Sequence, residues 1–207
     1  MAVELEGGCR VLGFKEGTPR RDGDLLIWDH FQSALSLRIL EVHGHATFHS
    51  DKHDEVLYVL EQNEGIHVPA GTQFVLSGDM TIVSSLTPSE ARGPRPEASV
   101  VRLDDQPIQK TGDRWYRELI QGETTLFVGS IPPGRAPDHF HLYEEVICIL
   151  AGSGVMWTGA KSAPIEPGSC IFLPRQQRHC VENTGNGELR LLGVFYPAGS
   201  PAVRYPA

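Results

Sequence analysis

The chain has 207 residues, enough for one large domain or two small ones, each able to bury a core. With 40% hydrophobic and 21% charged residues, its composition excludes a disordered chain. A formal net charge of −8 argues against nonspecific binding to nucleic acid or to an anionic membrane. The N-terminus lacks an apolar core of signal-peptide length, and no stretch reaches the ~20 apolar residues of a membrane span. We therefore expect a cytoplasmic location.

Short apolar segments, separated by many of the 22 glycines and 15 prolines, recur along the chain. Their length, β-branched content and alternation with polar residues favour strands. Strands are expected at residues 25–29, 35–42, 55–60, 125–131, 144–150, 170–174 and 189–196. Only residues 28–38 are ambiguous between helix and strand. The sequence therefore predicts an all-β fold.

One segment has the composition of a linker. Residues 87–98, TPSEARGPRPEA, contain three prolines, several charges and almost no large apolar side chain. It divides the chain into an expected N-terminal domain (1–90), a linker (91–111) and a C-terminal domain (112–207).

The two sides of this linker resemble each other. Residues 40–60 align without a gap on residues 130–150, so that His49 matches His139 and Glu55 matches Glu145. VPAG (68–71) aligns on LPRQ (173–176) only at an offset of 105, which makes the N-terminal half about 15 residues shorter there (105 − 90). Two short strands and their turn would account for the difference. Alternatively, a stretch of native chain is missing at residues 61–65.

A group of potential metal ligands lies in the C-terminal half. His139, His141 and Glu145 share a face of an extended chain, and His179 lies in a turn after the expected strand 170–174. Burying this group would be costly without a cation to pair the carboxylate. Imidazole and carboxylate together suit one divalent transition metal: Mn, Fe, Co, Ni, Cu or Zn.

These residues resemble the two sequence motifs of the cupin superfamily. The first motif is matched by His139, His141, Glu145 and the following Gly152, with Gly134 one position closer than usual. The second is matched by Pro174, His179 and Asn183, but Gln176 replaces the usual glycine and puts the turn conformation there in question. The resemblance implies two tandem cupin (double-stranded β-helix, or jelly-roll) barrels, of which the N-terminal one is shortened. It also implies that the four ligands bind one metal.

The N-terminal half matches the same motifs only in part. His49 and Glu55 are kept, but Asp51 and Phe74 occupy positions of two ligand histidines. A degenerate, structural barrel is the simpler interpretation. A rearranged site of His49, Asp51, His53 and Glu55 is the alternative. The pair His43 and His45 aligns before the ligand strand, so we do not expect it to bind metal.

Other side chains are candidates for contact with a substrate. Tyr143 shares the parity of His141 and Glu145 and either acts as a general acid or base or caps the strand turn. The arginines expected at the mouth of the barrel either hold an anionic substrate or lie on the surface. They are Arg135, Arg175 and Arg178. Phe127 and Ile147, with Ile149 and Val181, have the parity of an apolar pocket wall.

These features predict a metal-dependent enzyme that acts on a small oxygen-rich molecule, such as a hydroxy acid, enol, diketone or sugar derivative. The reaction is either a Lewis-acid isomerisation or elimination, or a dioxygen-dependent oxidation. The alternative is a noncatalytic or regulatory binding protein with a structural metal or none. A homodimer is expected from the resemblance and from the exposed strand edges of such barrels, whereas nucleic-acid and membrane partners are not.

Overall fold

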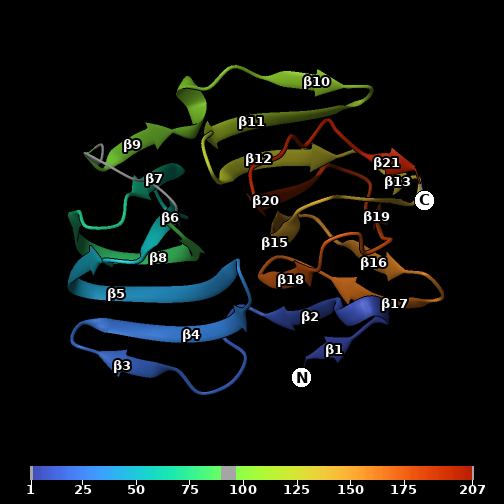
Figure 1. The fold of residues 1–207 in the computed structure, drawn as a ribbon. Coiled ribbons are helices and arrows are strands. Elements are labelled where there is room, and N and C mark those ends of the chain that lie inside the picture. Colours follow the sequence, from blue (N-terminus) through green and yellow to red (C-terminus); the bar gives the residue numbers. More distant parts are fainter. Residues whose placement is uncertain (1, 90–96, 207) are drawn as a thin grey trace. The chain divides into compact units, whose positions relative to one another are not determined.

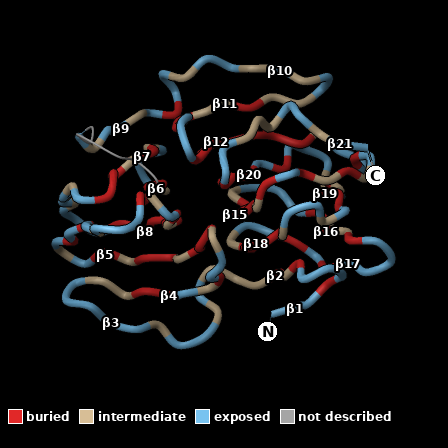
Figure 2. The backbone as a smooth tube through the Cα atoms, viewed as in Figure 1, coloured by how far each residue is buried: buried red, intermediate tan, exposed pale blue. Residues whose placement is uncertain are grey.

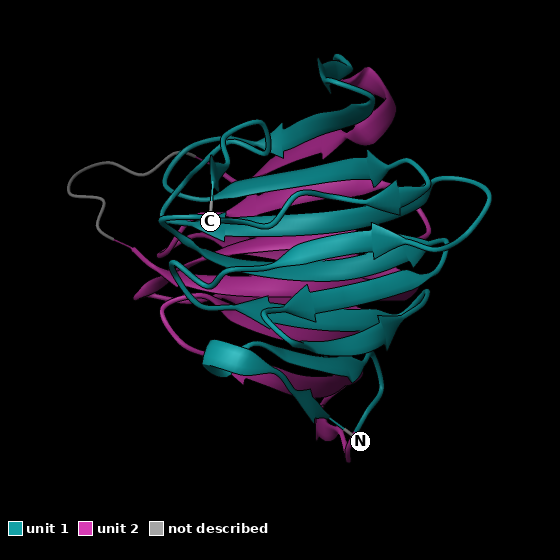
Figure 3. Cartoon of the chain, turned by 90° about the vertical axis from the view of Figure 1, so that its right-hand side faces the viewer, with its two compact units in different colours: residues 1–16, 107–207 teal, residues 17–106 magenta. Residues whose placement is uncertain are grey.

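The computed structural model describes residues 2–89 and 97–206, and within them the chain is almost entirely β-structure (Figure 1). It divides into two compact units (Figure 3). Unit 1 comprises residues 1–16 and 107–207, and unit 2 comprises residues 17–106. The expected all-β fold is confirmed, and the ambiguous residues 28–38 contribute to strands on either side of a short turn.

Unit 1 contains a large and a small sheet. The large sheet has the order β1-β2-β18-β15-β20-β12-β11-β10, and the small one β13-β19-β16-β17. The strands of the large sheet are β1 (Val3–Glu4), β2 (Arg10–Gly13), β18 (Ser169–Leu173), β15 (Glu144–Ala151), β20 (Leu189–Tyr196), β12 (Thr125–Ile131), β11 (Arg114–Ile120) and β10 (Gln109–Thr111), with the 3₁₀ turn η1 (Glu6–Gly8) after β1. The small sheet contains β13 (Gly134–Arg135), β19 (Cys180–Asn183), β16 (Gly154–Thr158) and β17 (Lys161–Ile165), and a separate pair is formed by β14 (His139–Phe140) and β21 (Tyr205–Pro206).

The interior of unit 1 is apolar on the face that also presents the expected metal ligands. Alternate residues of β15 and β18 enter one hydrophobic cluster, which includes Ile147, Ile149, Ile171 and Leu173. Strands β12 and β18 are buried along their whole length (Figure 2). Glu145 follows the same parity and is therefore directed into this apolar interior.

Unit 2 is a single seven-stranded sheet in the order β3-β4-β5-β8-β6-β7-β9. Its strands are β3 (Arg20–Asp22), β4 (Leu25–Gln32), β5 (Ser36–His49), β8 (Gln73–Pro88), β6 (His53–Val59), β7 (Glu64–Val68) and β9 (Ser99–Arg102), followed by the 3₁₀ turn η2 (Leu103–Asp105). The long strands β5 and β8 pair from Arg38 opposite Ser84 to His49 opposite Gln73. In unit 1 the corresponding strand pairing is divided between the two sheets: β12 pairs with β20 in the large sheet, and β13 pairs with β19 in the small sheet.

The internal repeat is visible in the strand register. Glu55 lies opposite Val68, as Glu145 lies opposite Leu173, which reproduces both sequence offsets. Between these landmarks unit 1 inserts the hairpin β16–β17, whereas in unit 2 a short turn joins β6 directly to β7. The prediction that two short strands and their turn account for the 15-residue difference is therefore confirmed.

The division into units differs from the expected domain boundaries at both ends. Residues 1–16 were expected in the N-terminal domain, but β2 pairs with β18 of unit 1, from Ser169 opposite Gly13 to Phe172 opposite Arg10. Part of the expected linker is also structured, because β9 adds to β7 as an edge strand of unit 2. Strand pairing over a long sequence separation gives no local signal, so composition alone misplaced these boundaries. Residues 90–96 of the expected linker lie outside the described residues.

Candidate metal centre and cavity

The three expected ligand histidines come together in unit 1. His139 lies on β14, His141 in the turn that follows, and His179 in the turn before β19. Reciprocal backbone hydrogen bonds of 3.0 and 2.9 Å join His139 to His179. One ring nitrogen from each histidine lies within 4.8 Å of the others, and all three residues are buried. Among the described residues this is the one group of three or more His, Cys, Asp and Glu side chains with such spacing.

Hydrogen bonds fix the ring orientation of two of these histidines. The Nδ1 atoms of His139 and His179 lie 3.0 Å and 2.8 Å from the backbone oxygens of Pro137 and Gln177. A carbonyl oxygen can only accept, so each Nδ1 carries the hydrogen and each Nε2 keeps its lone pair. This is the arrangement by which metal-binding histidines are usually oriented.

Glu145, the second residue of β15, completes the cluster. Its Oε2 lies 3.6 Å from Nε2 of His141 and 3.8 Å from Nε2 of His179. The atom is buried and has no hydrogen-bond partner in the structure. Burial raises the pKa of Glu145 to about 8. A buried carboxylate oxygen without a partner, facing imidazole nitrogens, is costly unless a cation binds there, so the residues fit a divalent metal.

Burial also keeps the histidines neutral. It lowers the pKa of His141 and of His179 to about 3, with smaller contributions from neighbouring imidazoles, and it lowers the pKa of His139. Neutral imidazole is the form that coordinates a metal, so these three side chains need lose no proton at neutral pH.

The turn that carries His179 has the conformation that the second motif requires. Gln176 has φ = 61°, in the left-handed region that favours glycine, and its N–H donates to the backbone oxygen of His141 at 2.7 Å. Asn183 anchors the following strand, because its side-chain amide donates to the backbone oxygens of Ile131 and Gly187. The replacement of glycine by Gln176 therefore leaves the turn in place but in a strained conformation.

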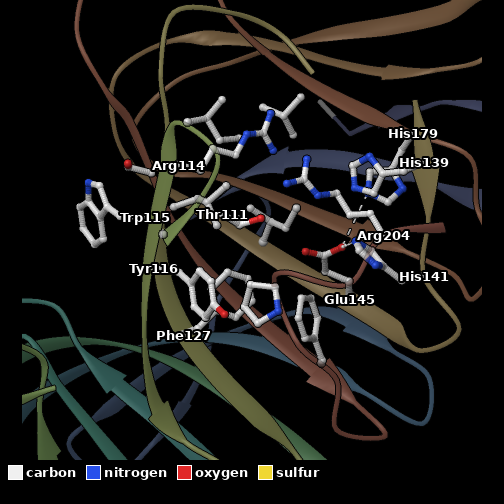
Figure 4. Close-up of a pocket in the computed structure, with 18 residues that line it drawn as sticks. Thr111, Arg114, Trp115, Tyr116, Phe127, His139, His141, Glu145, His179 and Arg204 are labelled. Carbon is white, nitrogen blue, oxygen red and sulfur yellow. Dashed lines mark ion pairs between the residues drawn. The ribbon is translucent and has the colours of Figure 1, made fainter. Parts of the chain in front are cut away.

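A cavity of about 80 Å³ opens beside the four ligand residues (Figure 4). Phe127, Ile147 and Val181 line it, as their parity predicted, whereas Ile149 is buried away from it. The volume of the cavity is several times the ~10–15 Å³ that one water molecule needs, so a small organic molecule fits. The full lining is Thr111, Arg114, Trp115, Tyr116, Phe127, Gly129, Ser130, Ile131, His139, His141, Glu145, Ile147, His179, Val181, Leu191, Phe195, Pro201 and Arg204.

The three arginines expected to bind an anion do not line this cavity. Arg135 is exposed, lies over the ring of Trp157 and contacts Asp138 at 3.4 Å. Arg178 is exposed and pairs with the same aspartate, and Arg175 is exposed. The lining of this cavity therefore gives no support to the substrate-binding role expected of Arg135, Arg175 and Arg178, which stays a prediction.

Arg114 and Arg204 lie in the cavity instead (Figure 4). The first begins β11 and the second precedes β21, far from the ligands in sequence. Trp115 and Tyr116 also line the cavity. The sequence DRWYREL (113–119) offers a pattern that could have indicated Arg114, because a basic residue stands beside two aromatic ones. No such pattern surrounds Arg204.

Tyr143 touches the cluster without facing the cavity. Its ring stacks on that of His141 at 4.9 Å with an interplanar angle of 12°, and its hydroxyl donates to the backbone oxygen of Ser200 at 3.1 Å. Burial raises the pKa of Tyr143 well above its usual range. The structure thus places Tyr143 as a support for the His141 ring and the C-terminal segment. The expected general acid or base role is not favoured by this geometry.

In unit 2 the corresponding residues do not form a cluster. His49 and His53 are exposed; His49 lies near Asp51 at 3.3 Å, and Phe74 packs against the apolar core. Glu55 is buried but accepts hydrogen bonds from the guanidinium of Arg38 and from the hydroxyl of Ser84. The degenerate, structural interpretation fits this arrangement, and the rearranged site does not. His43 and His45 are likewise exposed.

Comparison with known proteins agrees with this geometry. The family model described as "Cupin domain" matches residues 127–195. The oxalate-binding protein of Thermotoga maritima is 36% identical over 82 residues, 38% of this chain and 68% of that protein. Protein SchB of Streptomyces halstedii is 31% identical over 104 residues, 46% of this chain and 75% of its own. The chain therefore belongs to the cupin superfamily.

Solved structures extend the similarity to both units. Protein Ylba from E. coli superposes with a TM-score of 0.76 and 11% identity, covering 96% of this chain and 95% of its own. A mutant of the Bacillus subtilis oxalate decarboxylase OxdC gives a TM-score of 0.71 and 12% identity, covering 92% and 78%. At these identities the likeness concerns the fold: two tandem cupin barrels, the first lacking the β16–β17 hairpin. Among the described residues, no helix is long and apolar enough to span a membrane.

Proposed function

We propose that unit 1 is a metal-dependent enzyme acting on a small oxygen-rich acid. The observation that carries the proposal is the convergence of three neutral histidines, two of them oriented by hydrogen bonds, and a carboxylate oxygen without a hydrogen-bond partner at one wall of an otherwise largely apolar cavity. His139, His141, Glu145 and His179 would hold one divalent transition metal. When bound, the metal would supply open positions for oxygen ligands and Lewis-acid or redox chemistry.

The cavity residues bear on which reaction is supported. Isomerisation and elimination need a protein group that takes a proton from carbon. Within the described lining, the carboxylate and imidazole groups are those of the four ligands. Tyr116 is buried and its hydroxyl donates to Gln109 Oε1 at 2.9 Å. A dioxygen-dependent oxidation requires no separate protein base, so we favour it over isomerase or lyase chemistry.

The aromatic and aliphatic wall has a role in either reaction. Phe127 and Phe195 pack with ring centroids 4.8 Å apart, and Phe195 also contacts His141. Both rings line the cavity and form part of its apolar wall beside the cluster. A substrate would therefore enter with its oxygen atoms toward the histidines and its carbon atoms against these rings.

The test is metal analysis of protein purified without chelator, followed by oxygen-electrode assays with hydroxy acids, diketones and catechols. We expect about one metal per chain and oxygen uptake with at least one substrate class. His141→Ala should lose metal and uptake, whereas His53→Ala, an exposed histidine of unit 2, should keep both. Metal-loaded protein that exchanges substrate C–H protons without oxygen uptake would instead support isomerase or lyase chemistry.

A second function is supported by one comparison. The relative from Thermotoga maritima is described as oxalate-binding, and the cavity carries two arginines that suit a carboxylate. Unit 1 would then bind a small acid through the metal without turnover. Tight binding of oxalate by metal-loaded protein, with neither oxygen uptake nor substrate exchange, would favour this second function.

A further inference from the structure

Two guanidinium groups converge on the same side of the cavity. Arg114, at the start of β11, and Arg204, in the C-terminal segment 197–206, both line it and reach toward each other (Figure 4). Both are partly buried. Burial is the largest cause that lowers the pKa of Arg114, and the positive charge of the neighbouring Arg204 is the second largest. Two like charges held together in a partly dry cavity repel each other unless an anion binds between them.

The charged groups around this pair do not neutralise it. Among the described residues no ion pair is found for either guanidinium, and the carboxylate whose charge raises the pKa of Arg114 is that of the exposed Asp113. Glu145 is the one carboxylate in the described lining, and it faces the histidines. By contrast, the exposed Arg135 and Arg178 both pair with Asp138. The cavity thus holds a net positive charge that its own residues leave uncompensated.

Arg204 is also held in place. The C-terminal segment is tied to unit 1 by the Thr125 hydroxyl, which donates to the Gly199 oxygen at 2.9 Å, and by the Tyr143 hydroxyl on Ser200. Beyond Arg204, Tyr205 lies opposite Phe140 in the β14–β21 pair and stacks on its ring at 5.5 Å.

The ligand strand is therefore part of this attachment. β14 carries His139, and β21 begins at the residue after Arg204. The same two-stranded pair thus sets the position of a metal ligand and of the second guanidinium, so their spacing is built into the fold. A fixed pair of guanidiniums suits bidentate recognition of a carboxylate.

We propose that Arg114 and Arg204 form a carboxylate-binding subsite, so that the substrate of unit 1 is a diacid. One end chelates the metal and the remote carboxylate is received by the two arginines. The apolar residues Tyr116, Ile131 and Leu191, which also line the cavity, would contact the carbon atoms between these ends. The inference rests on the proposed metal site, and it names the substrate class for that site.

Two isosteric probes test the subsite. 2-Oxoglutarate and 2-oxovalerate share the same chelating 2-oxo acid and chain length, but only the first has a remote carboxylate. The full chain is loaded with Mn²⁺, its metal content is measured, and each probe is titrated by calorimetry, with the fluorescence of Trp115 in the cavity as a second readout. We expect 2-oxoglutarate to bind about 10- to 100-fold more tightly, the gain for hydrogen bonds between charged partners.

Variants assign the difference to the two arginines. Arg204→Gln and Arg114→Gln should each bring the affinity for 2-oxoglutarate close to that for 2-oxovalerate, while metal content and 2-oxovalerate binding stay at the wild-type level. Arg204→Lys should recover part of the preference, because it restores the charge but not the planar fork. Arg178→Gln, which removes an exposed arginine outside the cavity, is the matched control and should retain the full preference.

The outcomes separate this inference from the proposed function. Protein that does not hold metal overturns the proposed metal site. Protein that holds metal but binds both probes equally, or an Arg204→Gln variant that keeps the preference for 2-oxoglutarate, overturns the subsite alone. Equal weakening of both probes in Arg204→Gln would show that Arg204 acts through the fold or the metal, and would also overturn it.

Discussion

The two cupin units solve the same problem, a buried glutamate, in different ways. In unit 2, Arg38 lies opposite Ser84, and both donate to Glu55. The equivalent positions of unit 1 follow from the strand register. Ser84 lies opposite Leu57 in the same way as Gly193 lies opposite Ile147, so Gly193 corresponds to Ser84. Phe127, which lies opposite Gly193, then corresponds to Arg38. The carboxylate is thus paired by an internal cation in unit 2, whereas in unit 1 Oε2 of Glu145 has no hydrogen-bond partner and faces the histidines of the proposed metal site.

The difference shows which residues open a cavity. A β-carbon on Gly193 would lie 2.3 Å from the ring of Phe127, so this aromatic wall requires glycine across the strand. Where the wall residue is an arginine, its guanidinium fills the space and neutralises the glutamate. In unit 2, Asp51 and Phe74 at the positions of two ligand histidines thus occur together with an arginine–glutamate pair in the supporting strands.

The largest expected effect comes from removing equivalent histidines in the two units. His139→Ala should abolish stoichiometric metal binding, because it removes one of four ligands and its backbone-oriented ring. His49→Ala, the equivalent change in unit 2, should leave about one metal per chain. Elemental analysis of both purified proteins checks this, and equal metal loss in the two variants would contradict the assignment of a single site to unit 1.

The second prediction breaks the internal cation of unit 2. Arg38→Met leaves the buried Glu55 without its charged partner and should lower the free energy of unfolding by about 3 kcal/mol. Urea unfolding followed by Trp28 fluorescence measures it. The double variant Arg38→Met/Glu55→Gln should recover most of the loss, since the remaining amide can still bond Ser84. A destabilisation that persists in the double variant would point to lost packing of the arginine stem instead.

The third prediction concerns the proton on Glu145. Its pKa of about 8 means that the metal-free protein is protonated there at pH 6–7, whereas the histidines are neutral. Metal binding must then release about one proton, and affinity should rise by roughly tenfold per pH unit up to about pH 8 before levelling off. Calorimetry at pH 6.5 in two buffers of different ionisation enthalpy counts the proton. Glu145→Gln should release none, and buffer-independent heats in the native chain would refute the assignment.

The sequence predicted the strands and the four-residue cluster because local alternation and two short motifs encode them. The period of an extended chain predicted that His139, His141 and Glu145 lie together, although in the structure a turn that begins at His141 separates β14 from β15. The sequence did not predict that β2 pairs with β18, nor that Arg204 lines the cavity, since both features depend on contacts across most of the chain. The outward direction of Arg135 and Arg178 follows from Asp138, a partner that parity could not reveal.

The smallest expected effect lies in the turn before the last ligand, where the two units again differ. At an offset of 105, Gly71 has φ = 79° and Gln176 has φ = 61°, so the same left-handed conformation is held by a glycine in unit 2 and by a glutamine in unit 1. Gln176→Gly should stabilise the chain by about 1 kcal/mol, because it relieves the clash of a β-carbon in that region, less some backbone entropy. Gly71→Gln should destabilise it by a similar amount. Chemical denaturation of metal-free protein measures both. If Gln176→Gly were instead destabilising, the side chain of Gln176 would have a supporting contact that outweighs the strain, and the turn of unit 1 would be held by more than its backbone bond to His141.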